Sequence, residues 1–261
     1  MELGLRGKRA VVTAASAGLG FAVARALAAE GCRVAICSRE ADRISAAAAA
    51  IGEATGAEVL PAVVDVTRPG EIKAWVDEAA GRWGGLDVAV SNAGGPAPGT
   101  FGDLGPDDWD AAYRLTLRSA LETAFAVGPH LGRGGALVLM TSLTVKEPLG
   151  NLVLSTIFRA GVSALSKALA DEWAPRGIRV NQLIPGRIVT ARVAAMDEAT
   201  ARRRGIPLAA VRSSQEGVIP MGRYGEPDEF ARAAVFLASE AASYITGASL
   251  TVDGGLIRSI T

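Results

Sequence analysis

The chain has 261 residues, and its 27 basic and 27 acidic side chains leave a formal net charge of zero. That length is enough for one large α/β domain, and a neutral charge balance argues against a nucleic-acid partner. The single histidine excludes a metal site built from two or three histidines. The longest apolar runs fall well short of the ~20 residues of a membrane span, so no membrane-spanning segment is expected.

The two cysteines, Cys32 and Cys37, lie in or beside one predicted strand, too far apart to form a disulfide. Two reduced thiols are typical of a cytoplasmic protein. The opening residues lead directly into a strand, so we expect no signal peptide. We therefore predict a cytoplasmic protein with one domain over residues 1–261.

Short apolar runs alternate with segments of helical periodicity along the chain. Strands are predicted at 9–13, 33–37, 59–64, 86–90, 136–140 and 178–184, and helices at 21–31, 42–54, 69–83, from 107 onward and at 152–173. Alternation of this kind predicts parallel strands joined by right-handed crossovers. The expected fold class is α/β, with a doubly wound, mostly parallel Rossmann-type sheet and a ligand crevice at the carboxyl ends of its strands.

The first strand enters the first helix through the turn TAASAGLG, residues 13–20. Glycines in such a turn let backbone N–H groups approach a pyrophosphate, and the helix N-terminus adds partial positive charge. The turn therefore indicates a dinucleotide site built on Gly18 and Gly20. The alternative is a tight strand–helix turn without a ligand.

The second strand ends at Ser38 and Arg39. Enzymes that bind NAD usually place a carboxylate at this strand end, where it holds the ribose hydroxyls. No acid occupies that place, and Arg39 suits the 2′-phosphate of NADP instead. We expect NADP, with NAD possible; in the alternative interpretation Arg39 is a solvated residue paired with Glu40 or Asp42.

Several segments resemble the short-chain dehydrogenase/reductase family. They include Ser142, the helix end LADEWAPRGIRVN, the segment PGRIVT ending at Thr190, and the turn SNAG at residues 91–94. The resemblance runs from Leu5 to Gly255 and implies a homotetrameric oxidoreductase similar to 3-oxoacyl-(acyl-carrier-protein) reductase. In the family's pattern T-G-x-x-x-G-x-G, the first glycine is Ala14 here, which would be strained by ~1 kcal/mol or more if φ is positive.

The same resemblance implies a cofactor site along the strand ends. Its members are Thr13, Ser16, Gly18, Leu19, Gly20, Ser38, Arg39, Asp65, Val66, Asn92, Ala93, Gly94, Arg159, Pro185, Gly186, Ile188 and Thr190. Asn92 is expected to tie neighbouring strand ends, and Asp65 with Val66 to lie beside the adenine.

The family's Asn–Ser–Tyr–Lys tetrad is altered in this chain. Thirteen residues after Ser142, where the family has tyrosine, stands Ser155, and four residues later Arg159 replaces lysine. The asparagine position holds Thr116. Serine lacks the acidity of a phenol, and arginine stays protonated, so the usual proton transfer is lost. Lys146, just past Ser142, is the best-placed alternative donor.

Residues 191–222 resemble an insertion that covers the site as a substrate lid, because helix-compatible sequence ends there in a Pro/Gly stretch. Four arginines of this segment either meet an acidic substrate or form a solvated helix face: Arg202, Arg203, Arg204 and Arg212.

Three functions remain open at this stage. The first is an NADP(H)-dependent oxidoreductase that acts on a carbonyl/alcohol pair of a small molecule with a non-standard proton donor. The second is a dinucleotide- or ligand-binding protein without turnover. The third is a non-redox lyase or dehydratase on the same fold.

Overall fold

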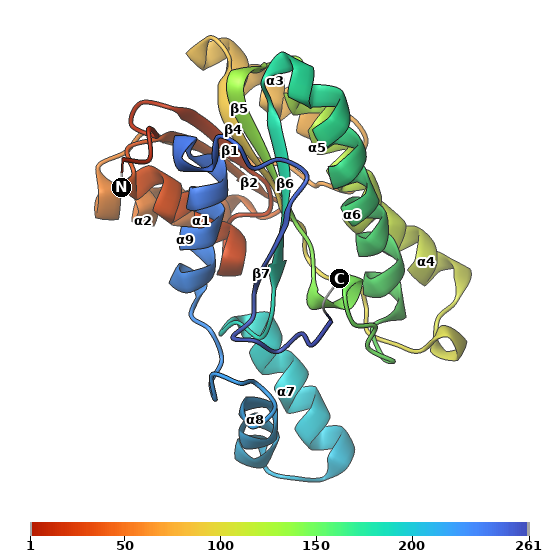
Figure 1. Ribbon diagram of the computed structural model, residues 1–261. Coiled ribbons are helices and arrows are strands. Elements are labelled where there is room, and N and C mark those ends of the chain that lie inside the picture. Colours follow the sequence, from red (N-terminus) through yellow and green to blue (C-terminus); the bar gives the residue numbers. More distant parts are fainter. Residues whose placement is uncertain (1, 260–261) are drawn as a thin grey trace.

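The core of the molecule is one parallel sheet with the strand order β3-β2-β1-β4-β5-β6-β7 (Figure 1). The structure, a computed structural model, describes residues 2–259, so residues 1 and 260–261 of the predicted domain lie outside the described residues. The strands are β1 (Arg9–Val12), β2 (Arg33–Ser38), β3 (Val59–Val63), β4 (Leu86–Ser91), β5 (Leu131–Met140), β6 (Arg179–Pro185) and β7 (Ser249–Val252). The prediction of a doubly wound, parallel sheet is confirmed.

Helices cover both faces of this sheet (Figure 1). The α-helices are α1 (Gly18–Ala29), α2 (Ala41–Thr55), α3 (Glu71–Trp83), α4 (Pro106–Ala112), α5 (Ser119–Val127), α6 (Val153–Trp173), α7 (Ala191–Arg204), α8 (Leu208–Glu216) and α9 (Pro227–Ala238). The short helical turns are η1 (Phe101–Asp103), η3 (Leu143–Val145), η4 (Ala174–Arg176) and η5 (Glu240–Ala242). A π-helical segment, η2 (Tyr113–Arg118), joins α4 to α5.

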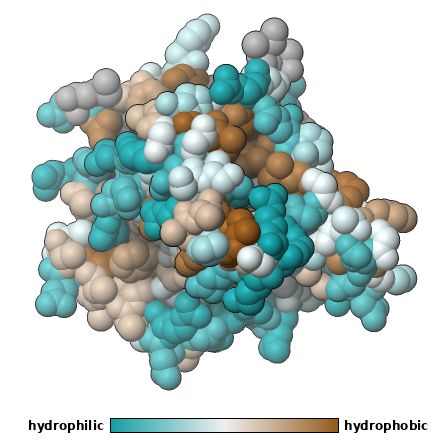
Figure 2. All heavy atoms as spheres, turned by 90° about the horizontal axis from the view of Figure 1, so that it is seen from below, coloured by the Kyte–Doolittle hydropathy of each residue, from teal (hydrophilic) through white to brown (hydrophobic). Residues whose placement is uncertain are grey.

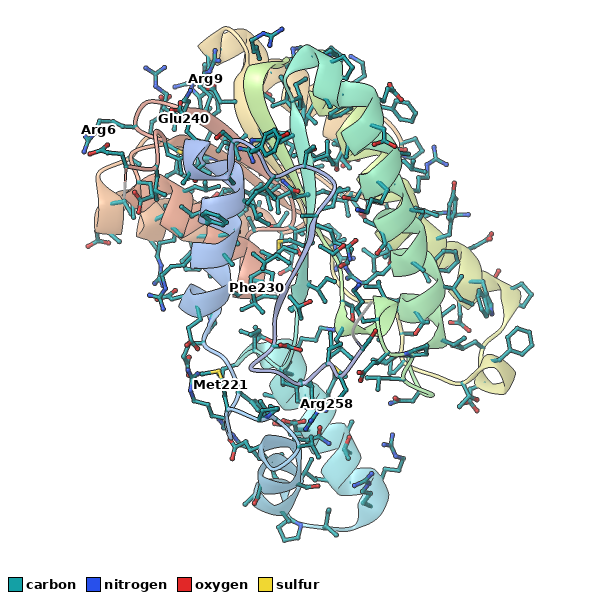
Figure 3. All side chains as sticks on the ribbon, in the orientation of Figure 1. Arg6, Arg9, Met221, Phe230, Glu240 and Arg258 are labelled. Carbon is teal, nitrogen blue, oxygen red and sulfur yellow. The ribbon has the colours of Figure 1, made fainter. Side chains whose placement is uncertain are left out.

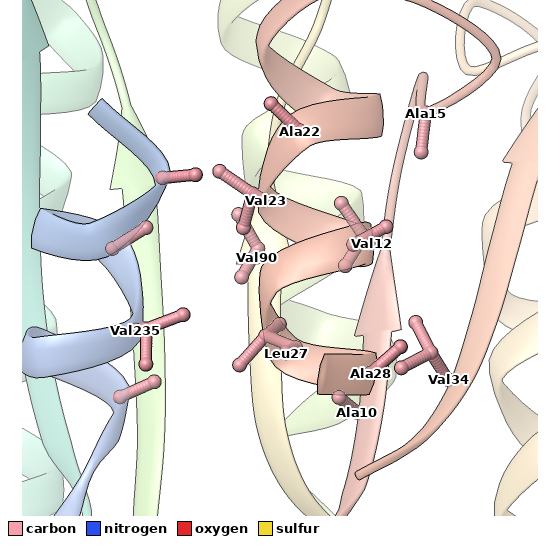
Figure 4. Packing of buried hydrophobic residues seen from close by; sticks show 14 of the residues in the cluster. Ala10, Val12, Ala15, Ala22, Val23, Leu27, Ala28, Val34, Val90 and Val235 are labelled. Carbon is pink, nitrogen blue, oxygen red and sulfur yellow. The ribbon is translucent and has the colours of Figure 1, made fainter. Parts of the chain in front are cut away.

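Two hydrophobic cores lie on opposite faces of the sheet because successive strand side chains alternate. Val12 of β1 packs in the core beneath α1, α2 and α9, whereas Val11 packs in the core beneath α3, α5 and α6. Figure 4 shows the first core, in which Leu27 and Val235 approach each other from α1 and α9. Phe230 lies between α9 and the sheet in Figure 3 and is fully buried. Burial of each such side chain stabilises the fold by about 1.5–3 kcal/mol.

The direction in which successive strands are added to the sheet reverses between β1 and β4. From β1 the chain moves outward through β2 to β3, then returns to the other side of β1 with β4. The connections after β1 and β4 therefore diverge above a shared edge, and sheets of this order bind ligands in a crevice at the carboxyl ends of these strands. The predicted crossover of strand, long helix and strand is β5, α6 and β6, with Ala136 opposite Arg179 in parallel register.

Strand β5 begins at Leu131, several residues before the predicted start at residue 136. The segment GRGG at residues 132–135 belongs to the strand although Gly134 has a positive φ of 85°, and the pairing with β4 shifts register between Leu86 and Val88. An irregular strand of this kind accommodates glycines that would break a regular one.

The segment Val153–Arg176 is long and apolar enough to cross a membrane by length and composition alone. It comprises α6 and the turn η4, and α6 packs beside β6 as a flanking helix of the sheet (Figure 1). Leu154 and Val162 of this helix are buried, whereas Ile157 is exposed.

Candidate active site

The turn after β1 has the strained backbone that the sequence predicted. Ala14 has φ 49° and is the one residue other than glycine with a positive φ among the described residues 2–259. Gly18 also has a positive φ, of 60°. A Cβ added to Gly20 would lie 2.5 Å from the Ala14 carbonyl oxygen and 2.7 Å from Nδ2 of Asn92. Only glycine therefore fits position 20, while alanine at position 14 is held there at a cost in strain.

Asn92 ties the end of β4 to the end of β1. Its backbone N–H donates to the hydroxyl of Thr13 at 2.8 Å, and that hydroxyl donates to the Asn92 carbonyl at 2.6 Å. Its side-chain Nδ2 donates to the Ala14 carbonyl at 3.1 Å. These bonds hold the backbone of the turn at Thr13 and Ala14 against the end of β4.

Arg39 lies at the end of β2 without a carboxylate partner among the described side chains. Glu40 instead pairs with Arg43, at 3.4 Å. Burial works to raise the pKa of Asp65, but hydrogen bonds from Thr67 and the nearby charge of Arg39 hold it below its ordinary value. Arg39 is exposed and close to Asp65, at the end of the crevice where the sequence predicted the adenosine half of the cofactor.

Ser142 and Ser155 both contact Thr144, which links them. Ser142 precedes η3, and its Oγ accepts the Thr144 backbone N–H at 3.3 Å. The Thr144 hydroxyl in turn lies 3.4 Å from Oγ of Ser155, which is buried at the third position of α6. The two serines therefore share one side of the sheet, at the carboxyl end of β5.

Arg159 is buried one turn further along α6 and donates its hydrogen bonds to the chain itself. Nη1 donates to the carbonyls of Met140 and Thr141, both at 3.1 Å. Nη2 donates to the carbonyls of Ala93 at 3.4 Å and Gly94 at 3.2 Å. The guanidinium thus holds the end of β5 against the loop that follows β4.

Burial, together with the nearby positive charge of Arg192, lowers the pKa of Arg159 to about 10. A guanidinium with that pKa is still protonated at neutral pH. Arg159 can therefore brace and attract negative charge, but it cannot release a proton in a reaction near pH 7.

Thr116 and Lys146 were the other two predicted catalytic positions. Thr116 is buried in the π-helical η2, and its hydroxyl has no hydrogen-bond partner among the described residues. π-Helical segments often occur at functional sites. Lys146 is half-buried and ends the turn η3 that begins at Ser142, so it lies on the same loop as that serine.

The segment after β6 forms the opposite wall of the crevice. Gly186 passes so close to Asp253 that an added Cβ would lie 2.4 Å from the aspartate Cβ. Ile188 is buried, and the Thr190 hydroxyl accepts the Val193 backbone N–H and so caps α7. Thr190 also lies near Gly18, since a Cβ added to that glycine would be 3.9 Å from the threonine methyl group.

The base of α7 is anchored by a buried ion pair. Asp197 accepts a bond from Arg187 at 2.7 Å and one from the Tyr224 hydroxyl at 2.8 Å. Burial and the hydrogen bond to Asp197 raise the pKa of Tyr224 to about 12. The tyrosine is therefore a neutral structural donor at neutral pH.

The arginines that the sequence analysis considered on this segment are exposed. Arg202 pairs loosely with Glu198, and Arg212 pairs with Glu216 and stacks over the Tyr224 ring. Figure 2 views the molecule from this side and shows hydrophilic residues around smaller apolar patches. The solvated-face interpretation fits these arginines.

Arg192 was missed by the sequence analysis. From the first turn of α7 its Nη1 donates to the Gly95 carbonyl at 3.2 Å and its Nη2 to the Pro96 carbonyl at 3.3 Å. It therefore joins α7 to the loop after β4. Its position two residues after Thr190, in the first helical turn, was the available signal.

The remaining predicted cofactor residues line the same strand ends. Val66 is buried beyond β3, Ser38 ends β2, and Ser16 and Leu19 are half-buried in the turn after β1. Together with the residues above, the structure brings the predicted set to one end of the sheet.

A parallel, doubly wound sheet with a glycine turn after β1 and a serine after β5, at the same end of the sheet, defines a Rossmann-type α/β protein. A family model described as enoyl-(acyl carrier protein) reductase matches residues 13–257. The chain belongs to the short-chain dehydrogenase/reductase family.

Individual relatives cover nearly the whole chain. D-threitol dehydrogenase of Mycolicibacterium smegmatis is 36% identical over 253 residues, 96% of this chain and 93% of the relative. A 3-oxoacyl-(acyl-carrier-protein) reductase of Chlamydia trachomatis is 32% identical over 251 residues, 95% of this chain and 97% of the relative. The crystal structure of L-sorbose reductase from Gluconobacter frateurii, complexed with NADPH and L-sorbose, superimposes with a TM-score of 0.94 at 31% identity, covering 100% of both chains.

Proposed function

We propose that this protein is an NADP(H)-dependent oxidoreductase that interconverts a carbonyl and an alcohol on a small molecule, with a non-standard proton donor. The observation that carries the proposal is the crevice in which the turn at Gly18 and Gly20 lies opposite Thr190, with Ser142 at a neighbouring strand end. A relative that acts on threitol and a similar structure complexed with NADPH and L-sorbose support it.

The residues present fit a dinucleotide. The missing side chain of Gly20 keeps the turn tight, and the N-terminus of α1 suits a pyrophosphate. Unpaired Arg39 suits a 2′-phosphate, which favours NADP(H) over NAD(H). When bound, the nicotinamide ring supplies or accepts a hydride. The chain's own residues then have to position the substrate oxygen and exchange its proton.

Ser142 is proposed to orient the substrate oxygen, because its hydroxyl lies at the end of β5 and can donate. By resemblance to the family, Ser155 and Arg159 are proposed to stand where tyrosine and lysine are usual. The Ser155 hydroxyl is buried against Thr144, and the Arg159 donors bond to four backbone carbonyls. We therefore assign proton donation to Lys146, or to a water in the crevice, rather than to either substituted residue.

The helices α7 and α8 are proposed to act as the substrate lid, within residues 191–222. They extend beyond the carboxyl end of the sheet in Figure 1, and Arg192 joins them to the loop after β4. We also propose a homotetramer in the cytoplasm. Exposed apolar side chains on η1, α5 and α6 support assembly, among them Phe101, Phe125 and Ile157, which are 74%, 78% and 47% exposed.

The test is NADPH oxidation on one panel of ketones and oxoesters by the wild type, Lys146→Ala and the double variant Ser155→Tyr with Arg159→Lys. If Lys146 is the donor, its replacement should lower kcat by roughly 10²–10⁴-fold, as loss of a positioned acid does. Lys73→Ala is the control, because Lys73 is exposed on α3 and pairs with Asp77. Wild-type turnover that survives Lys146→Ala would assign the proton to water.

A binding protein without turnover is the second candidate. It is favoured by the same contacts, since the Ser155 hydroxyl faces Thr144 and Arg159 donates to backbone carbonyls of the crevice wall, which leaves neither as a proton donor. NADPH binding without wild-type turnover on the panel, combined with activity in the double variant, would support this candidate over the enzyme.

A further inference from the structure

Two arginines at the crevice have no acidic partner. Arg159 is 7% exposed and Arg192 lies at the surface, and among the described residues neither forms an ion pair. Arg179, which is also buried, donates only to backbone carbonyls, whereas two less buried arginines do have an acidic partner. Arg187 pairs with Asp197, and Arg9 pairs with Asp87, both at 2.7 Å.

A buried cation without a counter-charge is unfavourable unless dipoles or an anion compensate it. The backbone carbonyls around Arg159 supply dipoles but no full negative charge. Burial lowers the pKa of both guanidiniums, and the charge of Arg192 adds to this effect at Arg159. The two positive charges are therefore close enough to repel each other, and a bound anion would relieve that repulsion.

The geometry leaves Arg192 able to bind such an anion directly. It uses two contacts, to the Gly95 and Pro96 carbonyls, out of the five N–H donors of a guanidinium. Both contacts are longer than 3.0 Å and weaker than bonds to a charged acceptor. Gly95 allows this approach, because an added Cβ would lie 2.0 Å from Nη2 of Arg192.

The acids near this end of the molecule are already engaged. Asp197 is held by Arg187 and Tyr224. Glu147 accepts the backbone N–H of Arg258, which lies near α7 in Figure 3. None of these groups neutralises the arginine pair.

We propose that the substrate carries a carboxylate, bound through the free N–H donors of Arg192 and attracted by the buried charge of Arg159. The planar fork of a guanidinium matches the two oxygens of a carboxylate. The substrate class is then an oxo acid and its hydroxy acid. This inference rests on the proposed function, because it names the substrate class of the same crevice.

The experiment measures binding without turnover. The full chain is titrated calorimetrically, with and without NADP⁺, with 2-oxo-, 3-oxo- and 4-oxopentanoate and with the methyl ester of each. An oxo compound and NADP⁺ are both oxidised, so no reaction occurs. The variants are Arg192→Gln and Arg192→Lys, and the matched control is Arg202→Gln, an exposed arginine on the same helix.

At least one acid should bind the wild type about tenfold or more tightly than its ester, the usual effect of a charge-assisted bond. Arg192→Gln should bring that ratio near one, Arg192→Lys should keep part of it, and Arg202→Gln should leave it unchanged. Equal binding of acid and ester, no binding of any acid, or a ratio that survives Arg192→Gln would overturn the proposal.

The affinity for NADP⁺ is measured on the same variants. If Arg192→Gln weakens NADP⁺ and leaves the acid-to-ester ratio unchanged, the anion is the cofactor's pyrophosphate and the substrate proposal is wrong. The proposed function fails separately. Acid-selective binding without NADPH oxidation would support the carboxylate site and contradict the proposed redox activity. Equal turnover of acids and esters would support the redox activity and contradict the carboxylate site.

Discussion

The turn after β1 and the start of α6 show two different responses to an unusual residue. In the turn, alanine replaces a glycine expected by the family pattern, yet the backbone keeps φ 49° at Ala14 and the bonds from Asn92 remain. In α6, Ser155 and Arg159 also occupy positions expected for other residues, and there the contacts themselves differ. Arg159 contacts four backbone carbonyls in the crevice wall.

The difference follows from what each region has to supply. A pyrophosphate is bound mostly by backbone N–H groups and a helix N-terminus, which a side-chain change leaves in place. Proton transfer needs one side chain with a suitable pKa at one position. Cofactor binding should therefore tolerate the substitutions in this chain, whereas the usual proton transfer should not.

The largest expected effect on stability comes from Arg159→Met. The loss of four hydrogen bonds would leave buried carbonyls without a donor and should lower the free energy of unfolding by roughly 2–4 kcal/mol. Urea denaturation of the variant measures this.

Arg179→Met is the matched comparison. Arg179 is also buried, and it donates to the carbonyls of Leu237, Ala238 and Ser239 at the end of α9. It should cost similar stability without changing the affinity for NADPH. Arg159→Met should in addition weaken the affinity for NADPH. If both variants change that affinity equally, Arg159 has no role in the crevice.

Gly20→Ala should test the turn through its closest contact. The added methyl group would meet the Ala14 carbonyl and the Asn92 amide, so we expect a loss of about 1–3 kcal/mol from overpacking. NADPH affinity should fall as well, because the turn has to open. Gly81→Ala, within α3 and without a neighbour within 4 Å, should be neutral or slightly stabilising. A stable Gly20→Ala variant with unchanged NADPH affinity would show that the turn does not bind the cofactor.

Ala14→Gly is expected to have the smallest effect, and a favourable one. Relief of the left-handed strain gains about 1–2 kcal/mol, and the greater freedom of glycine in the unfolded chain offsets about half of it. The variant should be more stable by about 0.5–1 kcal/mol in chemical denaturation, with NADPH binding retained. A destabilised variant would mean that the turn holds Ala14 without strain.

The sheet could be predicted from the sequence because its strands are short apolar runs with turn residues between them. The start of β5 could not, since the glycines after His130 have no side chains to form the apolar pattern of a strand. The tie between Asn92 and the end of β1 was predictable from a short motif. The contact of Arg192 with Gly95 was not, because residues 97 positions apart in the chain meet only after the whole sheet has formed.

The account depends most directly on cofactor binding, which calorimetric titration of the wild type and Arg39→Ala with NADPH and NADH measures. We predict that the wild type binds NADPH more tightly than NADH and that Arg39→Ala removes most of this preference, about 1–3 kcal/mol for a lost charge-assisted pair. Equal affinity of the wild type for both dinucleotides would contradict the role of Arg39, and no binding of either would contradict the account as a whole.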